Sequence, residues 1–374
     1  MSTGGPLTGV RVVEFAGLGP VPFACMLLSD MGAEILRIDR PDASERPGDI
    51  LNRGRASLTV DLKNDTELAS LRTIILAADV VIEGFRPGVM ERLGLGPDEL
   101  CSSNPRLVYA RMTGWGQDGP LAQRAGHDIN YIALAGALAP IGALGQPPVP
   151  PLNLVGDFGG GAMFAALGIV SALYERQRSG RGQVIDAAMV DGTASLLAMY
   201  LSHQQGSRGG TGLAKGAYFL DGSAPFYRCY ECADGLFVAV GAIEPKFWQI
   251  LTETIGLADT PSQQPATWDE TSRRLEAIFR TRPRDEWADL FRGLDACVTP
   301  LLAPDELIDD PQLAARGTYV HADDLRQPAP APRFSRTASA IAGPPSRVGV
   351  GGESLAATWL RQRAPSAAAE REPG

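Results

Sequence analysis

The first 190 residues alternate between short β-branched runs and runs with helical spacing, and this alternation constrains the fold more than any other feature. Strands that alternate with helices form a parallel sheet whose faces are covered by those helices. We therefore expect an α/β fold here, with helices that include 23–33 and 67–78. The expected strands are 10–16, 34–40, 57–63, 80–85, 107–115 and a run that begins at 183 and leads into a helix.

The pattern changes near residue 206, where a glycine-rich connector begins. The run YRCYECADGLFVAVGA (227–242) predicts a hairpin with Asp234-Gly235 as its tight turn. The proline-rich stretch 327–334 predicts an extended crossing segment. Because 374 residues exceed the length at which single cores usually stop growing, we expect two domains. The helices expected in the second part are 245–257, 272–282 and 285–294.

The charge balance limits the classes of partner. The net charge is −9, and no block of lysine or arginine occurs, which argues against nucleic acid or an anionic membrane. An anionic ligand would then need a local basic pocket. The N-terminal MSTGGPLTGV lacks the features of a signal peptide, and the apolar run 162–173 is too short to span a bilayer. We therefore expect a cytoplasmic protein with no membrane partner.

Five cysteines are too few for a disulfide scaffold in a chain of this length. The pair Cys229-x-x-Cys232 could hold a metal or act in redox chemistry, but no second pair or nearby histidine completes a tetrad. We favour structural cysteines and expect no metal site. The sequence also lacks a G-x-S-x-G motif, a Walker loop and a zinc signature, which argues against serine hydrolases, P-loop NTPases and zinc enzymes.

The first glycine turn, GLGPVP (17–22), follows an expected strand and opens a helix, as a dinucleotide fingerprint does. It lacks the third glycine of that fingerprint. The next strand ends with Arg37 and Arg40 on either side of Asp39. Two interpretations stay open: a site for a phosphorylated nucleotide, or a solvated strand end.

One carboxylate, Asp157, stands among the glycines of NLVGDFGGGA (153–162), just before an apolar run expected to be a helix from 163. Asp157 could be an ordinary helix N-cap. Alternatively, Gly159, Gly160 and Gly161 could let another molecule approach the helix start closely.

Histidine is scarce, which draws attention to His127 in AGHDINY. It lies in the irregular stretch 112–156, and its imidazole could exchange protons near neutrality or simply bond the loop backbone. His203 and His321 have the setting of surface or capping residues. Glu244 precedes Pro245, so it is either a helix N-cap or a carboxylate that orients a histidine.

Eight ordered blocks resemble the class III CoA-transferase family, and its acyl-CoA racemases in particular. The resemblance runs from about residue 7 to about 340, with the blocks at matching spacings. The blocks are GVRVVEFAGLGPVPFACMLLSDMGAEILRIDRP, VVIEGFRPGVMERLGLG, RLVYARMTGWGQDGP, AGHDINYIALAG, PPLNLVGDFGGG, GQVIDAAMVDG, YECADGLFVAVGAIEPKFW and DACVTPLL.

The resemblance implies a large Rossmann-like domain with a parallel sheet over 1–205, completed by a C-terminal return at 330–374. A linker and a smaller α+β domain would occupy 206–329. It also implies a homodimer whose chains interlock, each threading through the other. The CoA thioester would lie between the large domain of one subunit and the small domain of its partner.

The family's catalytic residues fall on His127, Asp157 and Glu244, with Glu244 supplied by the partner chain. No cofactor is implied, because CoA is part of the substrate. The CoA-binding positions fall on Leu18, Arg37, Arg40, Arg86, Gly126 and Gly156.

The implied activity is racemisation of 2-methylacyl-CoA thioesters in lipid or fatty acid metabolism. A proton alpha to the thioester would leave one face and return on the other, through an enolate, with His127 and Asp157 as the two acid–base groups. The alternative is transfer of CoA between carboxylic acids, in which Asp157 would form an anhydride with the acyl group. A CoA-binding regulator without catalysis would need none of the three catalytic groups.

Overall fold

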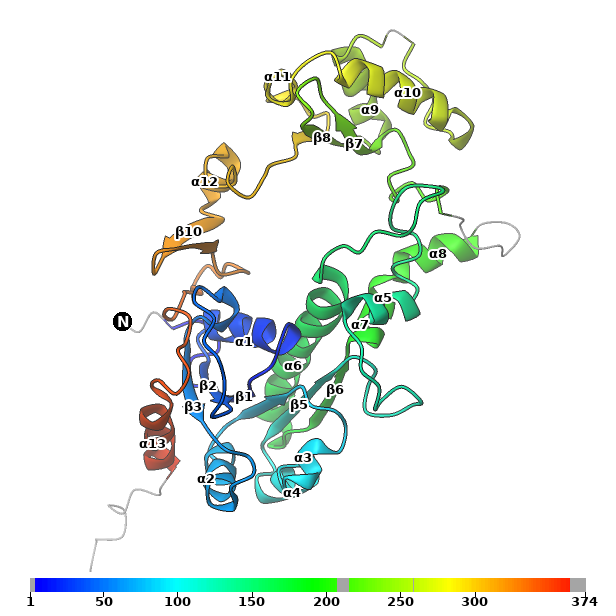
Figure 1. Cartoon of the computed structure of the whole chain (residues 1–374). Coiled ribbons are helices and arrows are strands. Elements are labelled where there is room, and N and C mark those ends of the chain that lie inside the picture. The colour runs from blue at the N-terminus through cyan, green and yellow to red at the C-terminus, as the bar shows by residue number, and fades with distance from the viewer. Residues whose placement is uncertain (1–3, 207–214, 258, 364–374) are drawn as a thin grey trace, which may run out of the picture. The chain divides into compact units, whose positions relative to one another are not determined.

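A computed structural model of the chain describes residues 4–206, 215–257 and 259–363 (Figure 1). The chain divides into two compact units, which are described separately below. The first comprises Met1–Ala135, Leu152–Leu196 and Ala314–Gly374, and the second comprises Gly136–Pro151 and Leu197–Leu313. The segment 136–151 therefore groups with the second unit, whereas the sequence placed it in the large domain.

A six-stranded sheet with all its strand pairs parallel forms the centre of the first unit. The strand order is β3-β2-β1-β4-β5-β6, which is the order of a Rossmann fold and confirms the expected Rossmann-like α/β architecture. Its strands β4 and β5 are buried along their whole length, as parallel strands covered on both faces are. The bounds are β1 (Arg11–Phe15), β2 (Glu34–Asp39), β3 (Arg55–Thr59), β4 (Val80–Glu83), β5 (Val108–Thr113) and β6 (Val184–Ala188).

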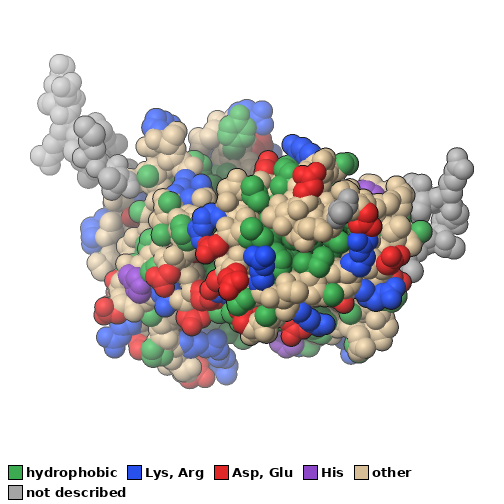
Figure 2. All heavy atoms as spheres, turned by 90° about the horizontal axis from the view of Figure 1, so that it is seen from above, with side chains coloured by type: hydrophobic (Ala, Val, Ile, Leu, Met, Phe, Trp, Pro, Cys, Tyr) green, Lys and Arg blue, Asp and Glu red, His purple; other side chains and the backbone are tan. Residues whose placement is uncertain are grey.

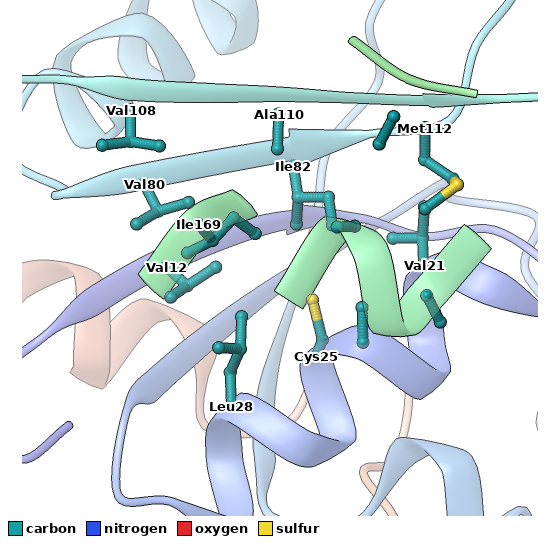
Figure 3. Close-up of a cluster of buried hydrophobic side chains, with 14 of the residues drawn as sticks. Val12, Val21, Cys25, Leu28, Val80, Ile82, Val108, Ala110, Met112 and Ile169 are labelled. Carbon is teal, nitrogen blue, oxygen red and sulfur yellow. The ribbon is translucent and has the colours of Figure 1, made fainter. Parts of the chain in front are cut away.

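Side chains of alternating strand positions enter two separate cores. One core packs Val12, Val80 and Ile82 against α1 and α6 (Figure 3). The other packs Val13 and Val81 against the helices of the opposite face. The helices of this unit are α1 (Pro20–Asp30), α2 (Asp65–Ile75), α3 (Val89–Arg92), α4 (Pro97–Ser103), α5 (Asp128–Leu134), α6 (Met163–Ser179), α7 (Met189–Leu196) and α13 (Gly352–Arg363), with a short 3₁₀ turn at Ile50–Asn52.

The helix expected from residue 163 begins nine residues earlier. Leu154–Ala162 forms a π-helix, η2, that continues directly into α6. The combined helix Leu154–Ser179 has 26 residues and, by length and composition alone, could cross a membrane. The run 162–173 was expected to be too short to span a bilayer, and this expectation is wrong because the helix that contains the run is longer. Its apolar character also has a core explanation, since Ile169 and its neighbours pack on the sheet.

The second unit contains an antiparallel sheet of order β7-β8-β9. The expected hairpin is present, with Gly235 in the left-handed region at φ 77°. Its core includes Trp248, Phe279 and Trp287. The bounds are α8 (Ala198–Gly206), β7 (Tyr227–Glu231), β8 (Phe237–Gly241), α9 (Pro245–Thr254), a 3₁₀ turn at Pro265–Thr267, α10 (Trp268–Phe279), α11 (Arg284–Phe291) and β9 (Val298–Pro300).

The C-terminal part returns to the first unit. After α12 (Pro311–Arg316), strands β10 (Tyr319–Ala322) and β11 (Leu325–Pro328) pair as an antiparallel hairpin. The first two residues of the proline-rich stretch 327–334 therefore belong to β11. Arg53 donates to the Gln327 side chain and to the Pro328 carbonyl at 2.9 and 2.8 Å. Farther along, Trp359 Nε1 of α13 donates to Glu34 at 2.9 Å. Buried and partly buried polar contacts thus hold this return against the first unit.

On the face seen in Figure 2, basic and acidic side chains are interspersed, with apolar side chains exposed between them. Mixed charges of this kind give no extended field of one sign. A site for an anion on this face would therefore depend on individual cations.

Candidate active site

The strand order of the first unit reverses between β1 and β4, and the loops that follow these two strands border one cavity. In open α/β sheets, ligands bind at the carboxyl ends of the strands at such a reversal. The cavity has a volume of about 350 Å³. It is lined by 17–21, 84–87, 112–115, 122, 124–127, Tyr131, Asp157 and Met189. His127 and Asp157, which the sequence predicts as the acid–base pair, thus share one cavity.

His127 is exposed and occupies the N-cap position of α5. The backbone N–H of His127 donates to Asn130 Oδ1 at 3.0 Å. The Tyr131 hydroxyl donates to the Gly126 carbonyl at 2.5 Å, directly before the histidine. A Cβ atom at Gly114 would lie 2.0 Å from the Tyr131 ring, so only glycine leaves room for that ring. Local hydrogen bonds and close packing therefore set the position of the His127 backbone.

Asp157 lies in the first turn of η2, where Asn153 is the N-cap. The interpretation of Asp157 as the N-cap is therefore wrong, because the helix starts before it. Asn153 Nδ2 donates to Asp157 Oδ2 at 3.4 Å. A Cβ atom at Gly19 would lie 2.8 Å from the same oxygen, so a glycine there lets the loop after β1 approach the carboxylate closely.

Burial raises the pKa of Asp157. The hydrogen bond from Asn153 and the charge of His127 oppose this shift, whereas the negative charge of Asp128 adds to it. A carboxyl group with a raised pKa exchanges its proton more readily near neutral pH. Such a group suits an acid–base role.

Asp128 is a contributor to the site that the sequence reasoning missed. It is buried, and its Oδ2 accepts the backbone N–H of Asp157 at 2.7 Å. Its Oδ1 is buried without a hydrogen-bond partner in the described part of the chain. The position of Asp128 directly after His127 was visible in the sequence, but its contact with residue 157 depends on tertiary structure.

The glycines after Asp157 serve helix packing. Cβ atoms at Gly160 and Gly161 would lie 2.7 Å from the Thr193 nitrogen and 2.8 Å from Met189 Cγ, both on α7. The expectation that these glycines admit another molecule is therefore wrong for these two positions. They allow η2 and α7 to approach each other closely.

A second cavity of about 370 Å³ lies at the carboxyl ends of β1 and β2. Its lining includes the predicted cations Arg37 and Arg40, together with Arg46, which the sequence reasoning did not single out. Arg37 is held by Asp39 at 2.7 Å and by Ser346 at 3.3 Å, whereas Arg40 is exposed. The same lining carries the carboxylates of Asp39, Glu45 and Asp49, so the three arginines stand among three acidic side chains.

Leu18 is 70% exposed and lines both cavities. Phe85 also lines both, while Arg86 and Gly126 line the cavity that holds His127. Gly156 is placed differently. It is buried, and a Cβ atom there would lie 2.6 Å from Asp128 Oδ2, so it makes room for that carboxylate.

Glu244 belongs to the second unit, where it is exposed at the N-cap position of α9. The Glu244 side chain accepts no capping hydrogen bond from the backbone N–H groups of α9, all of which the structure describes. Glu244 thus has the N-cap position that the sequence suggested, without the capping hydrogen bond.

Within residues 4–206, 215–257 and 259–363, no group of three or more His, Cys, Asp or Glu side chains could hold a metal ion. Cys232 is buried in the core of the second unit, and Cys229 is exposed on β7.

The sequence matches CoA-transferase family III over residues 7–349. The chain belongs to this family. A relative from Mus musculus named alpha-methylacyl-CoA racemase is 48% identical, over 88% of this chain and 87% of the relative. A relative of the same name from Homo sapiens is 45% identical, also over 88% of this chain and 87% of the relative. The crystal structure of Rv3272 from M. tuberculosis superposes with a TM-score of 0.77 at 28% identity, covering 94% of this chain and 99% of that one. The family III fold thus extends over nearly the whole chain.

Proposed function

We propose that this chain is a racemase that interconverts the two enantiomers of 2-methylacyl-CoA thioesters by moving one proton. The observation that carries the proposal is the presence of both His127 and Asp157 in the lining of one cavity at the reversal of the sheet. The names of the mouse and human relatives support the same reaction.

The proposed reaction needs an acid–base group on each face of the reacting carbon. The proton alpha to a thioester is weakly acidic, and its removal leaves an enolate. In one direction, Asp157 removes the proton and His127 returns one on the opposite face, and in the other direction the roles exchange. The N-terminal end of a helix favours the negative charge of the enolate, and the first turn of η2 borders the cavity at Asp157, although the Asp157 N–H itself already donates to Asp128. These proton transfers need no cofactor.

The remaining predicted residues take supporting roles in this proposal. Arg37 and Arg40, together with Arg46, provide charge for the phosphates of CoA in the second cavity. Leu18 borders both cavities and would lie along the chain that joins the phosphates to the thioester. Glu244, from the partner chain, would orient the imidazole of His127.

A homodimer is part of the proposal. The outer face of α6 exposes an apolar stripe at helical spacing, formed by Met163, Leu167, Val170 and Tyr174, which are 51%, 63%, 36% and 69% exposed. Exposed apolar stripes of this kind are typical of protein interfaces. A second copy of this chain is the partner that we propose for it.

CoA transfer is the second candidate, favoured by the family to which the chain belongs. In that reaction, the Asp157 carboxylate would attack the thioester carbonyl, forming an acyl anhydride and releasing CoA, whose thiolate attacks the Asp157 carbonyl and expels the donor acid. The acceptor carboxylate would then attack the resulting Asp157 thioester, and the CoA released would attack the acceptor carbonyl of the new anhydride, which frees Asp157. This chemistry requires Asp157 but has no need of an opposed second base, so His127 separates the two candidates.

The deciding experiment supplies each enantiomer of a 2-methylacyl-CoA separately, in deuterated water, to the parent, His127→Ala and Asp157→Ala. We expect the parent to racemise both and to incorporate deuterium at the alpha carbon. Each variant should lose at least roughly 100-fold in racemisation. Each variant should also still exchange the alpha proton of one enantiomer, because the remaining group acts on its own face.

The matched control is His321→Ala, which replaces an exposed histidine on β10 and should racemise like the parent. A parallel assay measures CoA transfer to free carboxylic acids. If the His127 variant transfers CoA efficiently while the parent incorporates no deuterium, the racemase proposal is wrong and the transferase is correct.

A further inference from the structure

The segment 84–90 follows β4, includes the first two residues of α3, and forms a wall of both cavities. Gly84, Phe85, Arg86 and Pro87 line the cavity that holds His127, and Phe85 also lines the cavity that holds Arg37. The Phe85 ring packs edge-on against Phe15 at 5.7 Å between centroids. Any shift of this segment would change the shape of both cavities together.

A single guanidinium group, that of Arg111, contacts both ends of this segment. Arg111 stands on β5, directly opposite Glu83 in the parallel pairing. Its Nε donates to Glu83 Oε1 at 3.1 Å at the end of β4. Its Nη1 and Nη2 reach the two carboxylate oxygens of Glu91, on α3, at 2.8 and 3.3 Å.

Glu83 also contacts the backbone of the segment, at Phe85. It is fully buried, and its Oε2 accepts the Phe85 N–H at 2.7 Å. Burial raises the pKa of Glu83 to about 7, against the opposing effects of the Phe85 N–H and of Arg111. A buried carboxylate without its cation would be costly, so Arg111 is needed for Glu83 to hold the loop in its charged form.

We propose that Arg111 is a positioning residue, which fixes both ends of the 84–90 segment and thereby holds Phe85 and Arg86 in place against the substrate. Arg111 itself lies outside the lining of the two cavities described above. This proposal rests on the proposed function in one respect, because it assumes that the acyl-CoA thioester binds in these two cavities.

Arg176 provides a matched control. Its side chain is about as buried as that of Arg111, 6% exposed against 8%, and it pairs at 2.9 Å with Asp79, which is 29% exposed where Glu83 is fully buried. Asp79 precedes β4 at the amino end of that strand, whereas Glu83 ends it. The two arginines therefore hold opposite ends of the same strand, Arg111 through two carboxylates and Arg176 through one carboxylate and two backbone carbonyls.

The test compares Arg111→Lys with Arg176→Lys. Lysine keeps the charge but lacks the planar fork that contacts two carboxylates at once. In the protein without substrate, we expect faster amide hydrogen exchange over 84–91 in the Arg111 variant alone. In the deuterium assay, we expect its KM for the acyl-CoA to rise roughly tenfold with kcat changed by less than about threefold. The Arg176 variant should keep the parent KM.

Glu91→Gln is a milder second variant, because Glu91 is partly exposed and the change keeps an acceptor for the guanidinium. We expect a KM increase in the same direction but smaller. Unchanged exchange over 84–91 in the Arg111 variant would overturn the proposal, as would an unchanged KM, or an equal KM increase in both lysine variants. The failure of the proposed function would be recognised separately, by a parent enzyme that incorporates no deuterium.

Discussion

At the scale of single residues, the site depends on two neighbouring carboxylates with different tasks. Asp157 lines the cavity, while Asp128 is buried behind it and accepts the Asp157 backbone N–H. The negative charge of Asp128 helps to raise the pKa of Asp157, after the larger effect of burial. The acid–base behaviour of Asp157 is thus partly set by a residue outside the cavity lining.

Replacing Asp128 with asparagine should move the pH profile to lower pH. Asparagine keeps an oxygen for the Asp157 N–H but removes the negative charge, so the pKa of Asp157 falls. For the enantiomer whose proton Asp157 removes, the rise of kcat/KM with pH should then occur at lower pH. The measurement is the pH dependence of deuterium incorporation from each enantiomer.

The control for this profile is Asp118→Asn, which neutralises an exposed carboxylate in the loop that leads to His127. Its profile should match that of the parent. A rise that stays in place, or moves to higher pH, in the Asp128 variant would contradict the electrostatic role of Asp128.

At the scale of elements, the close approach of η2 and α7 places Asp157. The two helices meet at glycines on both sides. A Cβ atom at Gly192 would lie 1.8 Å from the Gly160 carbonyl oxygen, and one at Gly160 would lie 2.7 Å from the Thr193 nitrogen. Backbone atoms cannot move aside as the end of a flexible side chain can. A larger residue at either position must therefore separate the helices.

Gly160→Ala and Gly192→Ala should each lower the free energy of unfolding by about 1–3 kcal/mol or more, as overpacking of a core does. Gly168→Ala, farther along the same helix, is the control, because its Cβ atom would meet only the Ile185 side chain at 3.1 Å. The control should change stability by less than about 1 kcal/mol, since alanine also favours the helix. Denaturant unfolding measures the free energy of unfolding of all three variants. Equal losses of stability in all three would show that the contact with backbone atoms is not the cause of the loss.

At the scale of the whole molecule, the proposed dimer gives the α6 stripe a partner. Leu167→Glu would place a charge in the middle of that stripe. We expect the parent to sediment as a dimer at every concentration at which it is folded, because interlocked chains have no stable folded monomer. The variant should lose the dimer and its folded circular dichroism signal together.

Leu236→Glu changes a leucine that is 44% exposed next to the hairpin turn, and it should sediment like the parent. Sedimentation equilibrium with circular dichroism at matched concentrations distinguishes the outcomes. A parent that is folded and monomeric at low concentration would contradict the interlocked dimer.

The sequence alone was sufficient for the six strands of the parallel sheet and for some of its helices, because hydrophobic and β-branched patterns act over a few residues. The run 34–40 predicted β2, and the turn Asp234-Gly235 predicted the hairpin. Composition and spacing also singled out His127 and Asp157, although their roles came from the family resemblance. Local patterns thus identified the strands and the candidate groups, but not which of them meet.

The tertiary structure decided what depends on contacts between distant residues. Pairing of β1 with β4 places the loops after these strands around one cavity, although the strands are far apart in the chain. The helix that carries Asp157 begins at Leu154, as η2, and η2 packs closely against α7. Asp128 and Arg111 acquire their roles only from partners elsewhere in the chain, at Asp157 and at Glu83 and Glu91. Propensity and periodicity describe neighbours along the chain, whereas a buried charge is stabilised by whichever opposite charge or N–H group the fold brings to it.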